Sequence, residues 1–550
     1  MVAQRVAHIS RTTLITSLGT GVDTHYERMH SGSSGAGKPM QCPPLIEGLT
    51  RLETLICHAA TEVLPTHIGG RTALIISTTK GDIDYIHSRN PLDFDACKHY
   101  LSAHYATLAQ PLAYLTVSNA CISGVAAVIV ADRLIRSGKY DNIVVVGADV
   151  MSDFTTSGFK AFKSVSANLC RPYDKSRDGL SLGEACGAML LTADVALSQG
   201  YAVLGTGITN DANHISGPSR TGRPLADAIE EALREATATP TDVAFVNAHG
   251  TATLYNDEME SKALALAGLS HVPLNSLKPY FGHTLGASGV IEIIMSVEQL
   301  RRGVLLGTPG FEELGTPEPL NVSPAHRNIA GNLFIKTASG FGGCNAAVAI
   351  GTPVAKPHDP YVAALDTPLH TLATVSIARG QIECSGVNRL SAPTDFHTFI
   401  RTAYKQLADA NAKFFKMSDL CKLGYIGAEH IMREVSADAR IDTRSIAVVL
   451  TNRFSSAETD MQHQVMLDNG ENVSPVIFVY TLPNIIIGEV SIRHHLTGEG
   501  LFLIDAAPSE VADYARILLS HGRYTAVLVG SCEKTPDTYE LHMQMIVKQQ

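Results

Sequence analysis

One cysteine stands where the chain changes from one expected element to the next. Cys121 lies within TVSNACISGVAA (116–127), at the point where an apolar strand gives way to the first turn of a helix. Unpaired backbone N–H groups and the helix dipole at such a place lower the pKa of a thiol and make it nucleophilic. The alternative is a buried cysteine that only fills space as a small hydrophobic side chain.

Two histidines favour the interpretation of Cys121 as a nucleophile. His249 follows an apolar strand in VNAHGTATLYND (246–257), and His283 lies in NSLKPYFGHTLGASGVIE (275–292), ahead of a Gly/Ala-rich helix start. Taken by itself, each histidine would have a structural or surface role. Sites in open α/β sheets, however, gather in the loops at strand ends. One thiol and two imidazoles in such loops can attack an acyl group and stabilise an enolate oxygen.

Two neighbouring features extend this candidate site. Lys278 and Glu292 flank His283. If buried, the pair could hold the loop and tune the imidazole, whereas on the surface it would contribute little. A glycine turn in ASGFGGCNAAVAI (338–350) separates two strands. Its glycines could bring backbone N–H groups close to a ligand as an oxyanion site, or could serve only as a turn.

Short strands and intervening helices must position these loops. The apolar runs that predict buried strands are 73–77, 114–118, 143–147, 243–248, 333–339 and 347–351. Helical segments between them predict α/β layering around a central sheet. A helix is predicted directly after Ala120, apolar along one face and ended by Gly138.

Composition limits the class of protein. The 550-residue chain is 45% hydrophobic and 17% charged, with a formal net charge of −10, which predicts about three or four domain-sized units and no bulk nucleic-acid binding. Its ten cysteines form no CxxC pair and show no zinc-ligand spacing, so we expect reduced thiols and no metal. The N-terminal segment lacks the apolar core of a signal peptide, and no run reaches the ~18–20 apolar residues of a membrane helix. A cytoplasmic protein without membrane insertion is expected.

The chain repeats part of itself after a boundary expected in GTPVAKPHDP (351–360). ARILLSHGRYTAVLVGSCE (515–533) resembles ADRLIRSGKYDNIVVVGAD (131–149), and SIAVVLT (445–451) resembles RTALIIS (71–77). Shared strand–helix–strand architecture is one explanation. The matched Gly-Lys/Arg-Tyr and final Gly favour a partial second copy of the preceding domain.

Five segments together resemble the β-ketoacyl synthases, the condensing enzymes of fatty-acid and polyketide synthesis. ACISG, RPYDKSRDGLSLGEACGAMLL, NAHGTAT, SLKPYFGHTLGASG and GFGGCNAA occur in that family's order, over about residues 14–351. The resemblance implies a thiolase-like α/β fold, layered α/β/α/β/α from two similar halves. Residues 1–200 would form the half with the nucleophile, and 201–355 the half with the histidines.

The resemblance also assigns roles to the candidate residues. Cys121 would accept the acyl group. His249 and His283, as in the Cys-His-His type, would bind the extender thioester carbonyl and promote decarboxylation. Lys278 would complete the catalytic set, with Glu292 supporting it.

Phe341 would be the gating phenylalanine, and its backbone N–H would join that of Cys121 in the oxyanion hole. Thr251 and Thr253 would contact the phosphopantetheine arm. The implied reaction is a decarboxylative Claisen condensation of an acyl thioester with malonyl-acyl carrier protein, in fatty-acid or polyketide synthesis. No cofactor is implied, because the substrates travel on the carrier's phosphopantetheine.

The chain also departs from the family. Asn247 and Ala252 stand where the family has Glu and Gly around the first histidine, and Ser339 replaces a phenylalanine. The stretch before Cys121 is shorter than usual. Within residues 361–550, the segment IDAAPSE (504–510) stands where the nucleophile of a synthase should lie, and it contains no cysteine. We therefore expect residues 361–550 to form a third, inactive thiolase-like half that resembles a chain-length factor.

Partners and alternatives follow from these observations. The resemblance implies an acidic acyl carrier protein that docks on a basic patch, although the residues of that patch could instead form an ordinary solvated face. It also implies a homodimer or a heteromer with a synthase-like subunit. One alternative is a non-catalytic chain-length-factor-like or scaffold subunit. Another is a CoA-dependent thiolase-like enzyme that uses Cys344 as its second cysteine. The basic residues of the expected patch are Lys160, Lys163, Arg171 and Lys175.

Overall fold

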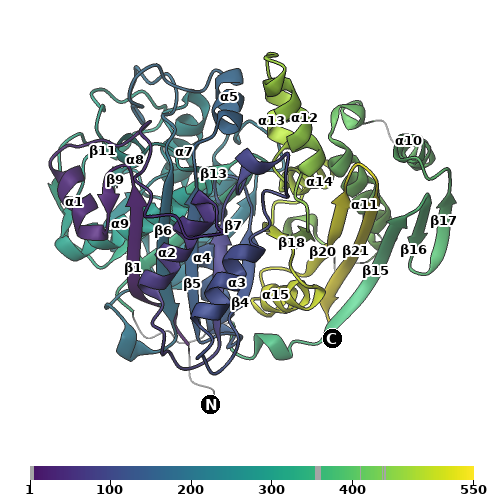
Figure 1. Ribbon diagram of the computed structural model, residues 1–550, viewed down its shortest axis with the longest axis horizontal. Coiled ribbons are helices and arrows are strands. Elements are labelled where there is room, and N and C mark those ends of the chain that lie inside the picture. The colour runs from purple at the N-terminus through teal and green to yellow at the C-terminus, as the bar shows by residue number, and fades with distance from the viewer. Residues whose placement is uncertain (1–4, 354–360, 409–410, 437, 439–440, 550) are drawn as a thin grey trace.

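The computed structural model describes residues 5–353, 361–408, 411–436, 438 and 441–549 (Figure 1). The strands of these residues form three five-stranded units that share one strand order. In each unit the first strand pairs antiparallel with the fifth and the fifth antiparallel with the fourth. The fourth then pairs parallel with the second, and the second parallel with the third. Two similar halves followed by a third are therefore confirmed. The six strands predicted from apolar runs are all present.

The strands of each unit are as follows, in sheet order. The first unit has β1 (His8–Thr16), β6 (Ala185–Thr192), β5 (Asn142–Asp149), β3 (Thr72–Ser77) and β4 (Ala113–Val117). The second has β7 (Ala202–Asn210), β14 (Cys344–Gly351), β13 (Leu333–Gly340), β8 (Phe245–Asn247) and β9 (Pro273–Asn275). The third has β15 (Leu369–Ala378), β21 (Tyr539–Lys548), β20 (Ala526–Lys534), β18 (Ile446–Asn452) and β19 (Gly500–Ile504).

The first two units form the expected five layers. Helices α4 (Ser123–Arg136) and α9 (Ser288–Arg302) contact strands of both sheets and each other, so they make the middle layer. Every residue of α4 is buried. Outside the sheets lie α2 (Arg51–Val63) on the first, and α6 (Arg223–Ala236) with α7 (Leu254–Leu266) on the second. The α/β/α/β/α arrangement places the ends of α4 and α9 between the two sheets.

The third unit has helices on both faces of its sheet. Helix α11 (Asp419–Val435) covers one face and α15 (Pro508–Ser520) the other. Between β18 and β19 the chain forms α12 (Ala457–Asp468), α13 (Pro475–Tyr480) and α14 (Ile485–His494). In the first unit the matching interval holds a single α-helix, α3 (Asp95–His104).

The remaining helices and strands connect or flank these units. They are α1 (Val22–His30), α5 (Asp153–Ala161), α8 (Lys278–Phe281), α10 (Phe396–Leu407), β2 (Gly19–Thr20), β10 (Val304–Leu305), β11 (Asn321–Val322), β12 (Arg327–Asn328), β16 (Gln381–Cys384) and β17 (Val387–Ser391). Within the part of the chain that the structure describes, no helix has the length and apolar character needed to cross a bilayer.

The third unit continues the sheet of the first (Figure 1). Strand β19 pairs antiparallel with β4, with Leu503 opposite Val117. Val117 pairs with Ser77 in the first unit, and Leu503 pairs with Thr451 in the third. Ser77 and Thr451 end the two similar segments 71–77 and 445–451, so Val117 and Leu503 occupy equivalent positions in their units. The two units therefore meet in the manner of a twofold, self-complementary interface, although both belong to one chain.

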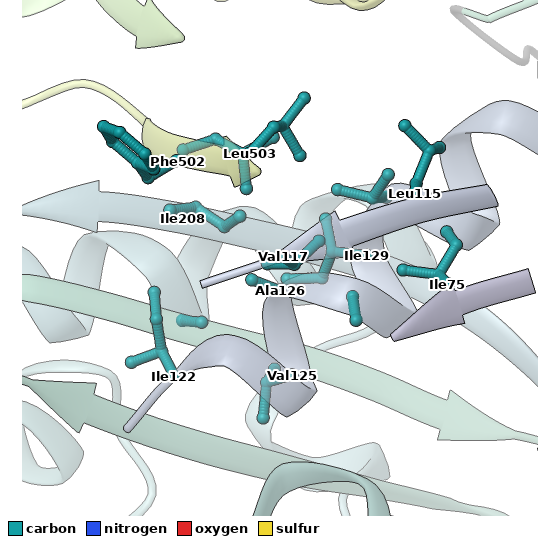
Figure 2. Packing of buried hydrophobic residues seen from close by; sticks show 14 of the residues in the cluster. Ile75, Leu115, Val117, Ile122, Val125, Ala126, Ile129, Ile208, Phe502 and Leu503 are labelled. Carbon is teal, nitrogen blue, oxygen red and sulfur yellow. The ribbon is translucent and has the colours of Figure 1, made fainter. Parts of the chain in front are cut away.

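Apolar packing and buried ion pairs hold this junction. Phe502 and Leu503 lie beside Val117 and the apolar side chains of α4 (Figure 2). Arg133 of α4 donates two hydrogen bonds to the carboxylate of Glu499, at 2.8 and 2.7 Å. Both side chains are buried, so removing either would leave an uncompensated charge, which is strongly destabilising.

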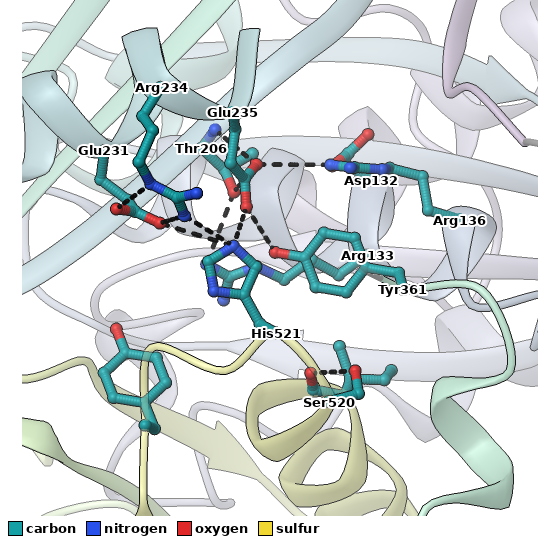
Figure 3. A network of polar contacts seen from close by, with 12 residues as sticks. Asp132, Arg133, Arg136, Thr206, Glu231, Arg234, Glu235, Tyr361, Ser520 and His521 are labelled. Atoms are coloured by element: carbon teal, nitrogen blue, oxygen red, sulfur yellow. Dashed lines mark hydrogen bonds and ion pairs between the residues drawn. The ribbon is translucent and has the colours of Figure 1, made fainter. Parts of the chain in front are cut away.

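A second polar group at the junction centres on Glu235 (Figure 3). Its carboxylate accepts from the Tyr361 hydroxyl at 2.7 Å and lies 2.8 Å from Nε2 of His521 and 3.3 Å from Nη1 of Arg136. Glu231, Glu235 and His521 lie close enough together to ligate a metal ion. The guanidinium group and hydroxyl already on Glu235 disfavour a cation there.

Candidate active site

A cavity of about 420 Å³ brings together most of the residues predicted from sequence. Its lining includes Cys121, His249, Thr251, Thr253, His283 and Phe341. Lys278 and Glu292 lie behind the two histidines, fully buried. Larger hollows of about 830 and 850 Å³ lie around α12 and contain none of these side chains.

Close backbone packing places the cysteine. Cys121 follows β4 and precedes α4, after a turn in which Ala120 has a positive φ of 50°. A Cβ on Gly124 would lie 2.8 Å from the carbonyl oxygen of Gly286 and 3.0 Å from Cα of Gly289. The start of α4 can therefore rest directly on the start of α9 only because Gly124 has no side chain. This contact brings Cys121 to the loop that carries the second histidine.

The pKa predicted for the nucleophile from sequence is wrong in direction. Burial raises the pKa of the Cys121 thiol to about 12, and the positive charge of Lys278 offsets only part of this shift. Desolvation disfavours the thiolate more than the nearby charge favours it. The thiol must therefore give its proton to a base when it reacts.

The raised pKa of the Cys121 thiol has a measurable consequence. Alkylation of Cys121 by iodoacetamide should accelerate about tenfold per pH unit from pH 7 to 9.5, because only the thiolate reacts and its fraction grows tenfold per unit below the pKa. Peptide mass spectrometry of the Cys121 peptide gives the rate, with a free-cysteine peptide as control. A plateau below pH 8 would show instead that the helix start lowers the pKa, as the sequence suggested.

The two histidines face each other as neutral rings. Their ring centroids lie 5.4 Å apart and the planes are nearly perpendicular. Burial and the charge of Lys278 hold the pKa of both His249 and His283 well below the usual value. Nδ1 of His283 accepts from the backbone N–H of Leu285 at 3.3 Å and lies 3.1 Å from the Ser288 hydroxyl. The proton of His283 therefore resides on Nε2.

A buried lysine that the sequence reasoning missed joins the expected pair. Nζ of Lys278 lies 2.9 Å from Glu292, and Lys336 of β13 forms an ion pair with the other carboxylate oxygen. Burial would raise the pKa of Glu292, but the two lysines outweigh it and lower that pKa. Lys336 also donates to the carbonyl oxygen of Ala248 at 3.2 Å, next to His249. The feature of the sequence that could have identified Lys336 is a lysine within the otherwise apolar run LFIKTAS (333–339).

A second missed residue, Glu260 of α7, fixes the loop of the first histidine. Its carboxylate accepts from the backbone N–H groups of His249 and Gly250 at 2.8 and 2.9 Å. The hydroxyls of Thr337 and Tyr173 donate to it as well, each at 2.7 Å. Four hydrogen bonds to one buried carboxylate hold the loop rigid.

Asn247 and Ala252, the two departures near His249, both lie in the protein interior. Ala252 takes a positive φ of 62°, a conformation in which glycine carries no steric cost. Asn247 donates to Asn275 at 2.9 Å, inside the protein. Neither substitution removes a side chain from the cavity lining.

The glycine turn places Phe341 at the wall of the cavity. Its ring packs on Phe159 and Phe162, with centroids 6.2 and 5.4 Å apart. Phe478 of the third unit packs on Phe159 in turn, at 5.3 Å. Helix α13 of the third unit thus backs this wall of the cavity.

Cys344, the second cysteine of the thiolase-like alternative, lies in a different environment from Cys121. It lies outside the cavity lining, fully buried, and its thiol donates to the carbonyl oxygen of Phe341 at 3.3 Å. Burial, with Cys121 nearby, holds the pKa of Cys344 well above its usual value. The third unit offers no thiol in the matching turn, where Asp505, Ala506 and Ala507 connect β19 to α15.

Comparison with known proteins places this geometry in a family. Residues 113–195 match the model of the beta-ketoacyl synthase N-terminal domain, and 201–312 match that of its C-terminal domain. Putative polyketide beta-ketoacyl synthase 1 of Streptomyces halstedii is 32% identical over 331 residues, which cover 53% of this chain and 75% of that protein. The chain belongs to the beta-ketoacyl synthase family.

Other members of the family match over a shorter stretch. The polyketide biosynthesis malonyl-ACP decarboxylase PksF of Bacillus subtilis is 34% identical over 260 residues, 44% of this chain and 60% of that protein. The chain spans about 60% of the length of several such curated relatives.

Solved structures of beta-ketoacyl synthases extend the likeness to the whole fold. The ketosynthase ApeO in complex with its chain length factor ApeC, from Xenorhabdus doucetiae, has a TM-score of 0.55 and 26% identity, over 64% of this chain and 98% of that one. The PfaC keto synthase-chain length factor has a TM-score of 0.73 over 99% of this chain and 78% of that one. At 13% identity, the second match shows the fold alone.

Proposed function

We propose that this protein is a β-ketoacyl-acyl carrier protein synthase that performs decarboxylative Claisen condensation. The observation that carries the proposal is the cavity that Cys121 shares with two buried, neutral imidazoles. A thiol supplies the nucleophile, and ring N–H groups supply donors for a developing enolate oxygen. The family membership supports the same chemistry.

The first step would load the acyl group. The sulfur of Cys121 attacks the carbonyl carbon of an acyl thioester, a C–S bond forms, and the thiol proton moves to an imidazole. His249 is the acceptor, because both ring nitrogens of His283 are engaged, Nδ1 with Leu285 N–H and Nε2 with its own proton. The bond to the carrier sulfur then breaks, and that sulfur takes the proton from His249.

The second step would extend the chain. Malonyl-carrier protein loses its carboxylate as carbon dioxide, and the electron pair of the broken C–C bond forms an enolate. The Nε2–H of His283 donates to the enolate oxygen. The enolate carbon then attacks the acyl carbon on Cys121, a C–C bond forms, the C–S bond breaks, and the Cys121 thiolate that leaves takes up a proton from water. A 3-ketoacyl thioester two carbons longer leaves on the carrier.

The rest of the chain would serve this reaction. We assign residues 1–200 and 201–355 to the two synthase halves and 361–550 to a nucleophile-free partner module; residues 354–360 at that boundary lie outside the described part. Phe478 against Phe159 supports a role of this module in shaping the acyl pocket. The likeness to a ketosynthase solved in complex with its chain length factor supports a partner role for this module.

The carrier protein would present its phosphopantetheine at the mouth of the cavity. Thr251 and Thr253 line it there, with hydroxyls 2.9 Å apart. We expect no free cofactor, because the arm belongs to the carrier. Of the basic candidates, Arg171 and Lys175 already face Glu312 and Glu313, at 3.0 and 2.9 Å. The exposed Lys160 and Lys163 are therefore the better docking candidates.

Supplying the purified protein with acyl- and malonyl-carrier protein tests the proposal. We expect release of carbon dioxide and a 3-ketoacyl product heavier than the starting acyl group by two carbons, two hydrogens and one oxygen, seen by intact mass of the carrier. Acetyl-CoA given alone is the control for thiolase-like chemistry, and we expect no product from it, because Cys344 is outside the cavity lining. A protein that never becomes acylated would be a scaffold.

A further inference from the structure

Asn119, two residues before Cys121, uses its whole side-chain amide on the third unit. Its Oδ1 accepts from the backbone N–H of Phe502 at 3.1 Å, and its Nδ2 donates to the carbonyl oxygen of Gly500 at 3.1 Å. A backbone N–H can only donate and a carbonyl can only accept, so both ends of the amide are fixed. The backbone N–H of Ser118 donates to the Phe502 carbonyl as well, at 3.1 Å. The turn that carries the nucleophile is thus tied to β19.

Asn484, at the start of α14, holds the other loop of the cavity. Its Nδ2 donates to the carbonyl oxygen of Phe341 at 2.8 Å, and its side chain is buried. Four residues on, a Cβ on Gly488 would lie 2.9 Å from the carbonyl oxygen of Gly342 and 3.0 Å from its Cα. Helix α14 therefore meets the glycine turn backbone against backbone.

These two tied segments also touch each other. A Cβ on Gly340 would lie 3.1 Å from the backbone nitrogen of Cys121. The backbones next to the N–H groups of Cys121 and Phe341 are therefore in contact. A shift of either segment would change the distance between the two donors.

We propose that the third unit, which has no nucleophile, positions the two backbone N–H groups that bind the thioester oxygen, those of Cys121 and Phe341. Asn119 and Asn484 are the positioning residues through which it does so. This inference rests on the proposed synthase function and deepens it. It gives the third unit a part in the chemical step itself, in addition to any part in shaping the acyl pocket.

The expected effect is on the step that creates an oxyanion. When Cys121 attacks the acyl carbonyl, the oxygen gains a negative charge that the two N–H groups must meet. Losing one such donor costs about 10²–10³ in rate, and a misplacement of about 1 Å costs roughly 10². Alkylation of Cys121 by iodoacetamide breaks a C–I bond and forms a C–S bond without any oxyanion, so it does not need these donors.

The test compares these two reactions in the full-length chain. Asn119→Ala and Asn484→Ala are each given S-octanoyl-N-acetylcysteamine, a small acyl thioester, or iodoacetamide, and the mass gained at Cys121 is followed with time. We expect acylation to slow by about 10–100-fold, while alkylation stays within about twofold of the unchanged protein. A general disturbance of the fold would change both rates together.

Tyr514→Phe is the matched control. It removes the Tyr514 hydroxyl, which lies 2.7 Å from Arg133 and 2.8 Å from Glu499 at the same junction, but touches neither loop. Both of its rates should stay unchanged. If an asparagine variant does not fold, Gly488→Ala presses on Gly342 instead, and the same slowing of acylation alone is expected.

The outcomes separate this inference from the proposed function. If the unchanged protein is not acylated at Cys121, the synthase proposal fails. If it is acylated and the folded asparagine variants are acylated equally fast, the positioning role is overturned and the synthase proposal stands. Equal slowing of acylation and alkylation also overturns it, because that result indicates a disturbed cavity.

Discussion

Cys121→Ala should abolish chain extension while leaving malonyl decarboxylation. The variant lacks the sulfur that accepts the acyl group, so we expect loss of at least about 10³-fold in 3-ketoacyl product. His249 and His283 remain in the cavity and can still meet the enolate oxygen. Carbon dioxide release and intact mass of the carrier measure the two activities separately.

The control for this variant is another cysteine of similar exposure. Cys42 is half-buried and lies outside the cavity lining, so Cys42→Ala should behave like the unchanged protein in both assays. Continued extension by Cys121→Ala would refute the assigned nucleophile. Loss of decarboxylation along with extension would mean that the histidines need the thiol to act.

Glu292→Gln should lower the free energy of unfolding far more than the loss of an exposed ion pair would. Lys278 and Lys336 share this one carboxylate, and all three side chains are buried. Glutamine keeps the shape but removes the charge, which leaves two buried ammonium groups facing each other. Breaking a buried ion pair in this way costs about 3–5 kcal/mol of unfolding free energy. Urea denaturation followed by circular dichroism measures the change.

Glu313→Gln provides the comparison. It removes a carboxylate from the exposed pair with Lys175 and should leave the midpoint of unfolding almost unchanged, because solvent screens exposed pairs. If Glu292→Gln unfolds at the same denaturant concentration as Glu313→Gln, the buried lysines are not charged as the ion pairs require. Activity in the folded fraction of Glu292→Gln reports on the placement of His249 and His283.

Much of the architecture could be predicted from the sequence. Apolar runs such as 143–147 and 333–339 became strands β5 and β13, since strands buried on both faces of a sheet are apolar almost throughout. The cavity shared by Cys121, His249 and His283 also fits the expectation, because all three follow strand ends of two stacked sheets. Their chemical roles stay predictions until tested.

Contacts between distant parts of the chain could not be predicted in this way. Asn119 lies 381 residues from Gly500, and Asn484 lies 143 from Phe341. No local pattern marks an asparagine whose partners are backbone groups in another unit. The lowered pKa expected for Cys121 was wrong for a related reason: the depth of burial depends on how sheets and helices stack, which the local sequence does not report.

Because β4 and β19 belong to one polypeptide, their pairing does not depend on the concentration of the protein. Where two separate subunits complete a site, the fraction of complete sites falls on dilution, and identical subunits compete with the correct partner. Here the two strands are encoded in one chain, so their local concentration is set by the connecting polypeptide and not by the amount of protein in the cell. Each molecule that folds brings the turn of Cys121 and the third unit together in a ratio of one to one.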